Sequence, residues 1–365
     1  MGEHSLISWC GPTFNPWIGC SKVSPACKNC YAQVYGNRFG VEWGPGKPRR
    51  RTSASTWKNP LKWNRQANKD QERFLTGEYE GRRPPRPRVF CASLADWLDP
   101  EVPIEWLADL LALIQTTPYL DWLLLTKRPE LWSDRLHAVV EQTHDGADMW
   151  ASSWLDGKAP DNVWLGVTVE DQQRADERIP HLLEIPARVR FLSCEPLLAP
   201  IQLPRRIRLP RLVCGDWPIG HGIVAEKGEH LAFSNPLGAL SVQTPKGLLG
   251  IKPGELEHVG GCADWVIAGG ESGSGARPMH PDWARSLRDQ CQDAGVAFHF
   301  KQWGAWAPSE SALLNEDASN SEFDGTRDKG LRQALKGELG VTLKRVGKKV
   351  SGRLLDGREW NELPA

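Results

Sequence analysis

The 365-residue sequence lacks three features that would place a chain in a class at once. It has no net charge, because Lys and Arg total 45 and Asp and Glu also total 45, so its composition gives no evidence for a nucleic-acid or membrane partner. No stretch approaches the roughly 20 apolar residues that span a bilayer. The start of the chain has no basic segment followed by an apolar run, as a secretory leader would have. We therefore expect a cytoplasmic protein with no membrane partner.

The number of cysteines does not suggest a disulfide scaffold. Nine cysteines is an odd number, spread over a long chain, so a secreted disulfide framework is not expected. Three of them nevertheless fall within eleven positions, in "CSKVSPACKNC", as Cys20, Cys27 and Cys30. Such close spacing of thiols in a reducing compartment favours soft-metal binding over cross-linking.

Apolar runs alternate with helix-period segments along most of the chain. Near-continuous hydrophobic strands that alternate with amphipathic helices are typical of a parallel sheet covered on both faces. With a weaker first strand at 6–9, the pattern predicts about seven strands and an α/β fold, and a partial (β/α) barrel fits that count better than a doubly wound sheet. The other predicted strands are at 88–93, 121–129, 163–171, 188–196, 264–278 and 296–304.

Two segments interrupt this alternation. Residues 205–262 are rich in Gly and Pro, which predicts an irregular or β-rich insertion, and 307–365 predicts a polar linker followed by a C-terminal hairpin that turns on Asp356-Gly357. We therefore expect one barrel domain formed by residues 1–204 and 263–306.

Polar residues follow each predicted strand, at the carboxyl ends where parallel α/β proteins carry their chemistry. Alternatively, their charges pair with one another as buried ion pairs that stabilise the barrel. A carboxylate in the Gly-rich turn "AGGESGSG" would suit the amino group of a ligand. The candidates are Lys127 and Glu195 as catalytic residues, Arg128, Glu170 and Lys301 as a substrate rim, and Ser93, Asp96, Gly269, Gly270 and Glu271 as cofactor contacts.

The three clustered cysteines leave three alternatives open: an iron–sulfur cluster, zinc, or no metal. A zinc site would need a fourth ligand, for which Cys10 is the nearest cysteine. Three thiolates would instead leave one iron of a [4Fe–4S] cluster open to S-adenosylmethionine. Asn29 and Tyr31, beside Cys30, are candidate contacts to the adenine of that cofactor.

Several motifs, in order, resemble a phage-associated three-cysteine family, a domain of unknown function regarded as similar to radical S-adenosylmethionine enzymes. The resemblance covers 8–204, 263–306 and 342–364, and it implies a partial barrel with a [4Fe–4S] cluster on the three clustered cysteines. It differs from the usual radical-enzyme pattern in the six-residue first gap and in the late position of "GGE". The motifs are "FNPWIGCSKVSPACKNCYA", "LADWLD", "LLLTKRP", "VWLGVTVED", "FLSCEPLL", "WVIAGGESGSGARPM", "FKQWGAW" and "GRLLDGREWNELP".

Two functional hypotheses follow. The first is a radical-enzyme-like protein that generates a 5′-deoxyadenosyl radical, receives electrons from a donor and acts on a nucleic acid or nucleotide. The basic loops at 44–51 and 81–88 and the basic C-terminal segment suggest that substrate class, as does the excess of Trp, 18 against 4 Tyr. The second is a non-catalytic, zinc-stabilised module of phage origin that binds a nucleic acid or a protein and uses Cys10 as the fourth zinc ligand.

Overall fold

The computed structural model describes residues 5, 7–78, 81–144, 146–208, 224–226, 229–233, 240–244, 247–251, 257–308 and 341–364. The chain divides into two compact units: Met1–Thr168 with Ile185–Phe191, and Val169–Glu184 with Leu192–Ala365. Seven strands are joined in one sheet, in the order β1-β4-β5-β6-β7-β14-β15. The fold is therefore a mixed α/β fold with a curled half-barrel sheet, as the alternation predicts.

The first unit holds four parallel strands. β1 pairs with β4, β4 with β5, and β5 with β6, all in parallel. Their apolar residues are buried on both faces of the sheet, which explains why the runs are hydrophobic without alternation. The bounds of the strands are Thr13–Phe14 for β1, Arg88–Cys91 for β4, Asp121–Thr126 for β5 and Val163–Thr168 for β6.

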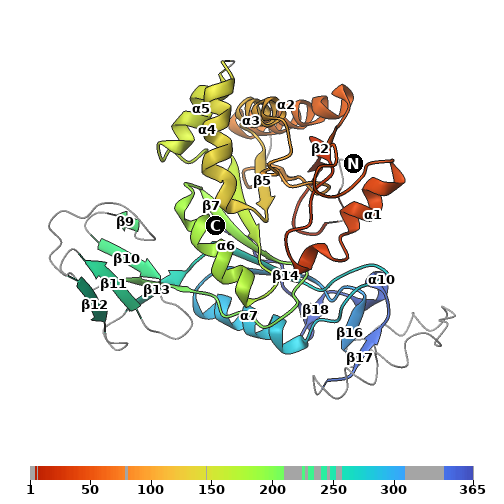
Figure 1. Cartoon of the computed structure of the whole chain (residues 1–365), viewed down its shortest axis with the longest axis vertical. Helices are drawn as coiled ribbons and strands as arrows, with labels where there is room; N and C mark the ends of the chain where they lie inside the picture. The colour runs from red at the N-terminus through yellow and green to blue at the C-terminus, as the bar shows by residue number, and fades with distance from the viewer. Residues whose placement is uncertain are drawn as a thin grey trace. The chain divides into compact units, whose positions relative to one another are not determined.

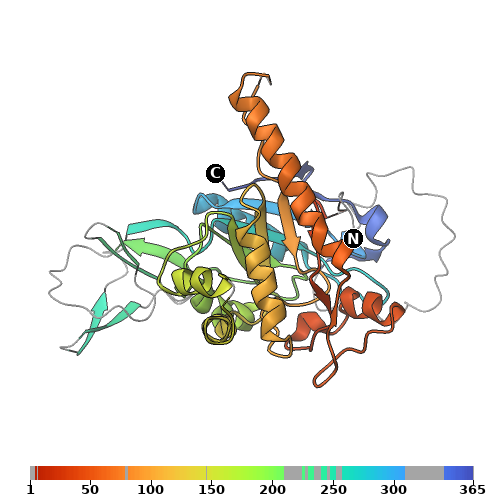
Figure 2. The ribbon, with the colours of Figure 1, turned by 90° about the horizontal axis from the view of Figure 1, so that it is seen from above.

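Three helices of the first unit pack against one another: α3 (Ile104–Gln115), α4 (Trp132–Gln142) and α5 (Ala147–Leu155) (Figure 1). The long helix α2 (Ala54–Leu75) begins at Ser53, whose hydroxyl accepts from the Thr56 amide. Figure 2 shows that α2 extends well beyond its point of contact with the neighbouring strands.

A short antiparallel pair in this unit brackets the cysteine segment: β2 (Trp17–Ile18) precedes it and β3 (Arg50–Arg51) follows it. The 3-10 helix η1 (Pro25–Cys27) and helix α1 (Tyr31–Arg38) follow β2, and the 3-10 helix η2 (Pro129–Leu131) follows β5. The three clustered cysteines therefore lie between β2 and the first turn of α1.

The second unit holds α6 (Gln172–Glu184), the parallel pair β14 (Trp265–Gly269) and β15 (Ala297–Gln302), and α7 (Pro281–Asp293) between them. β7 (Val189–Cys194) belongs partly to each unit. At the end of the chain β16 (Trp306–Pro308) pairs with β17 (Leu343–Arg345), α10 (Lys348–Ser351) follows, and β18 (Leu354–Leu355) pairs with β19 (Arg358–Glu359) across Asp356-Gly357.

Further strands lie between β7 and β14. They are β8 (Arg205–Arg208), β9 (Val224–Glu226), β10 (Glu229–Phe233), β11 (Leu240–Thr244), β12 (Gly247–Ile251) and β13 (Glu257–Gly261). β13, β8, β10 and β9 form one antiparallel sheet, and β11 pairs with β12. The polar stretch expected at 308–340 lies, from residue 309 on, outside the described residues.

The prediction of a first strand at 6–9 is wrong. Ser8 and Trp9 form a turn, and the first strand of the sheet is β1, which consists of only two residues. The apolar character of 6–9 has another cause, because the Trp9 ring is buried against Phe90 with the ring centroids 4.6 Å apart. In the described residues no helix is both long enough and apolar enough to cross a bilayer.

Candidate functional site

Asp96 organises the polar edge of the first unit at the carboxyl ends of β4 and β5. Its Oδ1 accepts hydrogen bonds from Thr126 Oγ1 at 2.7 Å and from the Leu98 amide at 3.1 Å. Its Oδ2 accepts from the Lys127 amide at 2.9 Å and from Arg128 Nη1 at 3.0 Å. One buried carboxylate thus fixes the backbone and the guanidinium that follow β5.

Arg128 joins this edge to the first cysteine. Its Nη1 and Nη2 lie 3.6 and 3.7 Å from Cys20 Sγ, and Nη2 also donates to the Ser21 carbonyl at 3.0 Å. Burial and the negative charge of Asp96 raise the pKa of Cys20 to about 12, although the Arg128 cation acts to lower it. Without a bound metal, Cys20 is therefore a thiol at neutral pH.

Lys127 acts electrostatically on the second cysteine, Cys27. Burial acts to raise the pKa of Cys27, but the Lys127 charge and hydrogen bonds from Val23 and Ser24 more than compensate and hold it below its ordinary value. The Ser24 hydroxyl lies 3.9 Å from Cys27 Sγ. Two successive residues, Lys127 and Arg128, thus bring positive charge to two of the three clustered cysteines.

The segment that carries Cys20 is anchored by a buried arginine that the sequence did not mark. Arg49 Nε donates to Asp99 Oδ2 at 2.8 Å, and its Nη2 donates to Ser21 Oγ at 2.8 Å. Ser21 Oγ in turn donates to Glu101 Oε1 at 3.0 Å. Arg49 lies in the basic loop 44–51 that suggested a nucleic-acid or nucleotide substrate, and its fully buried side chain is not available to such a ligand.

Tyr31 and Ser93, two predicted cofactor contacts, come together at the end of β4. Tyr31 Oη donates to the Ser93 carbonyl at 2.9 Å while its side chain stays 58% exposed. Buried Asn15 holds the same turn, because its Nδ2 donates to Ser93 Oγ at 3.0 Å and its Oδ1 accepts from the Leu94 amide at 2.7 Å. Asn29 lies half-buried two residues before Tyr31.

The thiols of the cysteine segment are free, and none forms a disulfide. Among the residues that the structure describes, no three or more His, Cys, Asp or Glu side chains converge closely enough to hold a metal ion. The donor chemistry still fits a thiolate-bound group, because Arg128 donates hydrogen bonds toward Cys20 and the Lys127 charge acts on Cys27, although Asp96 and Asp99 add negative charge beside Cys20. Side-chain rotation of the thiols would be needed to close such a site.

Cys10, the fourth ligand that zinc would require, lies away from the other three. It precedes β1 and acts electrostatically on Arg88, the first residue of β4, whereas Cys20 and Cys27 face residues that follow β5. The four residues of β4 separate these two ends by about 10 Å. Cys10 is therefore badly placed to complete a site with Cys20.

In the second unit, the predicted strand-end charges pair with one another. Glu170 is fully buried and accepts from Arg178 Nη1 at 2.9 Å. Lys301 Nζ lies 2.6 Å from Glu195 Oε1. Glu271 accepts from the Nη2 of Arg277 at 2.6 Å and from its Nε and backbone amide at 2.8 Å each. This arrangement matches the alternative of structural ion pairs.

The glycines before Glu271 have a packing role in the same unit. A Cβ on Gly270 would lie 1.9 Å from the Trp303 carbonyl oxygen, so only glycine allows the backbones to approach there. A Cβ on Gly269 would meet its nearest neighbours, in Gln302 and Glu195, at an ordinary 3.5 Å. A cofactor is not needed to explain glycine at position 270.

The chain belongs to the family described as "Protein of unknown function (DUF5131)", whose model matches residues 4–364. The match covers nearly the whole length of the chain and spans both units. No curated protein and no solved structure was found to match it.

Proposed function

We propose that the protein is an enzyme that holds a [4Fe–4S] cluster on Cys20, Cys27 and Cys30 and uses it with S-adenosylmethionine. The observation that carries this proposal is the placement of Arg128 against Cys20 and of Lys127 near Cys27. A thiolate-bound cluster is anionic, and adjacent cations and hydrogen bonds to its sulfurs stabilise it. The similarity to radical enzymes and the phage association implied by the motifs belong to the same proposal.

The position of Cys10 favours an open coordination site over a closed one. With Cys10 near the opposite end of β4, the cysteine segment would supply three thiolates and leave a fourth position for a small molecule. When bound, a cluster with an open iron would supply the electron that cleaves S-adenosylmethionine into methionine and a 5′-deoxyadenosyl radical. The electron would come from a separate donor.

The chain's own residues position the cofactor in this proposal. The exposed ring of Tyr31, fixed through its hydroxyl to Ser93, offers a flat surface for adenine beside Cys30. Asp96 holds Arg128 in place and leaves Lys127 Nζ without a hydrogen bond or ion pair among the described residues. Lys127 is thus available to a substrate or to the carboxylate of the cofactor.

A nucleic acid or nucleotide is the proposed substrate class, but the loops that suggested it do not support it well. In 44–51, Arg49 is buried and Arg51 lies 2.6 Å from Asp109 and over the Trp57 ring. In 81–88, Arg83 donates to Gln71 and Arg86 lies near Asp121. Most of these charges are engaged within the first unit.

Anaerobic purification with iron, sulfide and zinc quantification tests the cluster. We expect about four iron atoms per chain with a brown colour, and less than one in Cys27→Ala. Cys10→Ala is the matched control, and it keeps its iron because Cys10 lies beyond the other end of β4. Stoichiometric zinc that is lost in Cys10→Ala would instead establish the non-catalytic binding module.

The cofactor is tested separately. Addition of S-adenosylmethionine to the reduced, iron-loaded protein should change the spectrum of the cluster and yield 5′-deoxyadenosine. Tyr31→Ala should weaken this effect and leave the iron content unchanged, because Tyr31 is not a ligand. A full cluster with no response to the cofactor would reject the radical chemistry and retain the cluster.

A further inference from the structure

Helix α2 carries five cations on a single face. Lys58, Lys62, Arg65, Lys69 and Arg73, called here the basic stripe, recur at spacings of four, three, four and four residues. At 3.6 residues per turn, these spacings keep all five side chains within an arc of about 80° over about 22 Å of helix. All five are exposed.

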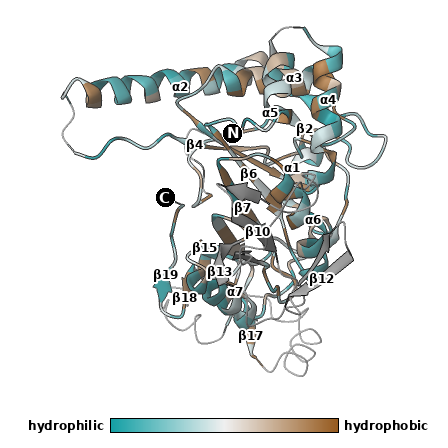
Figure 3. Ribbon diagram, turned by 90° about the vertical axis from the view of Figure 1, so that its left-hand side faces the viewer, coloured by the Kyte–Doolittle hydropathy of each residue, from teal (hydrophilic) through white to brown (hydrophobic). Residues whose placement is uncertain are grey.

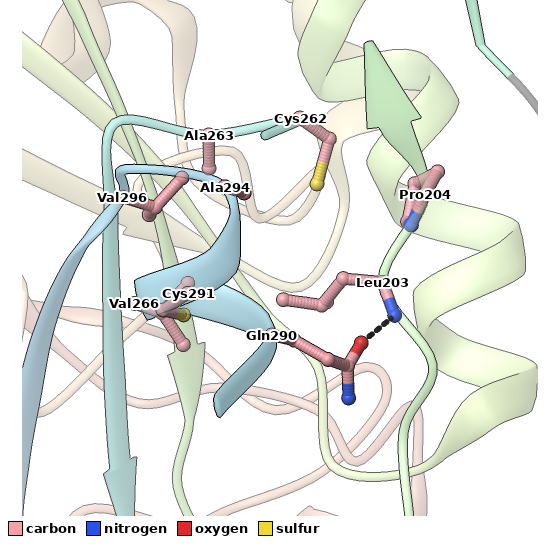
Figure 4. A pocket seen from close by; sticks show the side chains of 9 residues that line it. All are labelled: Leu203, Pro204, Cys262, Ala263, Val266, Gln290, Cys291, Ala294 and Val296. Carbon is pink, nitrogen blue, oxygen red and sulfur yellow. Dashed lines mark hydrogen bonds between the residues drawn. The ribbon is translucent and has the colours of Figure 1, made fainter. Parts of the chain in front are cut away.

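The opposite face attaches α2 to the rest of its unit. Pro60, Ala67 and Gln71 are the buried residues of the helix, and they lie about half a turn away from the basic stripe. Gln71 also accepts a hydrogen bond from Arg83 Nε at 2.6 Å. Figure 3 shows α2 as one long, largely hydrophilic helix. The basic stripe therefore points into solvent.

Helix α2 carries few acidic residues that could neutralise the basic stripe. Asp70 accepts from Gln66 Nε2 at 3.0 Å and Glu72 from Asn68 Nδ2 at 2.9 Å, so both acids are bonded to amides. Arg73 lies 3.9 Å from Glu78, an exposed pair that is worth little. Lys58, Lys62, Arg65 and Lys69 make no ion pair with any described residue.

This arrangement is unfavourable for the isolated helix. Like charges four residues apart destabilise a helix by about 0.2–0.5 kcal/mol per pair, and α2 has three such pairs within its basic stripe. A solvated helix face more commonly alternates acids and bases, which stabilises it. The arrangement is therefore better explained by a polyanion than by solvent exposure alone.

A cavity of about 470 Å³ adjoins the stripe. Lys62 belongs to both, and the half-buried Trp63 forms part of the cavity wall. The other lining residues present mainly hydroxyl and amide groups: Thr13, Phe14, Thr56, Asn59 and Gln66. An indole beside amides suits a flat polar ring whose edge carries hydrogen-bond donors and acceptors.

We propose that α2 binds single-stranded nucleic acid, with the phosphates along the basic stripe and a base in the cavity beside Trp63. Cations that repeat along a rod provide sequence-independent affinity for phosphates, and an adjacent aromatic surface for stacking favours an unpaired base. The inference does not depend on the cluster proposed above, since every residue involved belongs to α2 or β1.

An anionic membrane fits this face less well. A helix that lies on a bilayer needs an apolar face opposite its basic one. The buried face of α2 is already occupied within its unit, and its exposed large hydrophobic residues are two leucines, Leu61 and Leu75, fourteen positions apart. Negatively charged vesicles are therefore a control and not the expected ligand.

Fluorescence anisotropy with a labelled 20-residue oligothymidylate, read over a range of salt concentrations, tests the proposal. With five phosphate contacts, log K should fall with log salt with a slope of about −3.5. The triple variant Lys62→Gln, Arg65→Gln, Lys69→Gln should bind at least about tenfold more weakly, and its slope should be smaller by about 2. Glutamine is a good helix former, so helicity by circular dichroism should not change.

The matched control removes the same charge elsewhere. Arg38→Gln, Lys158→Gln, Lys349→Gln also removes three exposed cations, none of them on α2, and it should leave affinity and slope nearly unchanged. Trp63→Ala should weaken binding about fivefold or more with the same slope, because stacking does not release counterions.

Three results would overturn the proposal. The first is an equal loss of affinity in the control and stripe variants, and the second is no salt-dependent binding of the oligonucleotide at all. The third is binding to phosphatidylserine vesicles in place of the oligonucleotide. None of these results bears on iron content, so the two proposals succeed or fail separately.

Discussion

Both units carry charged residues at the ends of their strands, but these charges are paired differently in the two units. In the second unit each acid is matched by a base of its own, as in Glu170 with Arg178 and Glu271 with Arg277. In the first unit a single acid, Asp96, is matched by Arg128, whose guanidinium also contacts a thiol. A neighbouring cation, Lys127, has no ion-pair partner among the described residues.

The difference shows why a polar strand end is a weak indicator of function. A carboxylate and a guanidinium that satisfy each other leave little capacity for a ligand, whereas Lys127, which has no ion-pair partner among the described residues, leaves positive charge near Cys27 for another group. The first unit therefore carries the candidate site, and the second unit mainly carries stabilising pairs. The predictions below test that division.

The largest effect is expected in the second unit. Arg178→Met removes the guanidinium that pairs with the wholly buried Glu170, and the free energy of unfolding should fall by about 3–5 kcal/mol. Urea denaturation measures this loss. Arg174→Met on the same helix removes a pair with the half-exposed Glu177 and should cost less than about 1 kcal/mol. Equal losses would mean that the buried pair is not specially stabilising.

A smaller loss separates packing from cofactor binding at the Gly-rich turn. Gly270→Ala places a methyl group against the Trp303 carbonyl, so the unfolding free energy should fall by about 3 kcal/mol. Gly269→Ala meets only ordinary contacts and should be tolerated. If both variants unfold normally but lose response to S-adenosylmethionine, the turn binds the cofactor and its packing role is secondary.

The smallest effect is expected at a solvent-exposed carboxylate–guanidinium pair, that of Asp356 with Arg285 and Arg288. Burial acts to raise the pKa of Asp356, but hydrogen bonds from Arg288 and from Arg285, the latter at 2.8 Å, lower it below its ordinary value. Because the folded-state pKa lies below the unfolded value of about 3.9, this stabilisation is present above pH 4 and is lost as pH falls through the folded pKa.

Asp356→Asn should therefore reduce stability at pH 7 by less than about 1 kcal/mol, since solvent screens the pair. It should also flatten the fall in stability below pH 4, as measured by thermal unfolding across pH. Asp156→Asn, an exposed acid after α5 that makes no ion pair with any described residue, should leave that profile unchanged. A steeper acid dependence in Asp356→Asn would contradict the assignment.

The sheet could be predicted because strands that are buried on both faces appear in the sequence as continuous hydrophobic runs. The runs that became β5 and β6 are almost wholly apolar, and the boundaries of these two strands lie within three residues of those predicted, whereas the strand predicted at 264–278 already ends at Gly269. Helix α2 could not be predicted in the same way, because it buries only Pro60, Ala67 and Gln71 and so lacks an apolar period. β1 has two residues, too few for any pattern.

Only part of the candidate site could be predicted from the sequence. The cysteine spacing and the strand-end position of Asp96 were visible, since both depend on local sequence. The partners that hold them were not, because Asn15 and Arg49 reach the site from 78 and 28 positions away from the serines they contact. The cations of α2 do recur at helical spacing in the sequence, but this signal differs from the dense basic loops on which the prediction of a nucleic-acid partner rested.

Because Arg49 is buried and bonded to Ser21, the cysteine segment becomes ordered when the chain folds and not when a ligand binds. Its guanidinium also donates to the carbonyls of Gly44 at 3.0 Å and Lys47 at 2.7 Å, so one side chain restrains two loops. Fixing a residue costs about 1–2 kcal/mol of conformational entropy. Near Ser21 that cost is incurred when the chain folds, so an arriving ligand meets a surface that is already ordered.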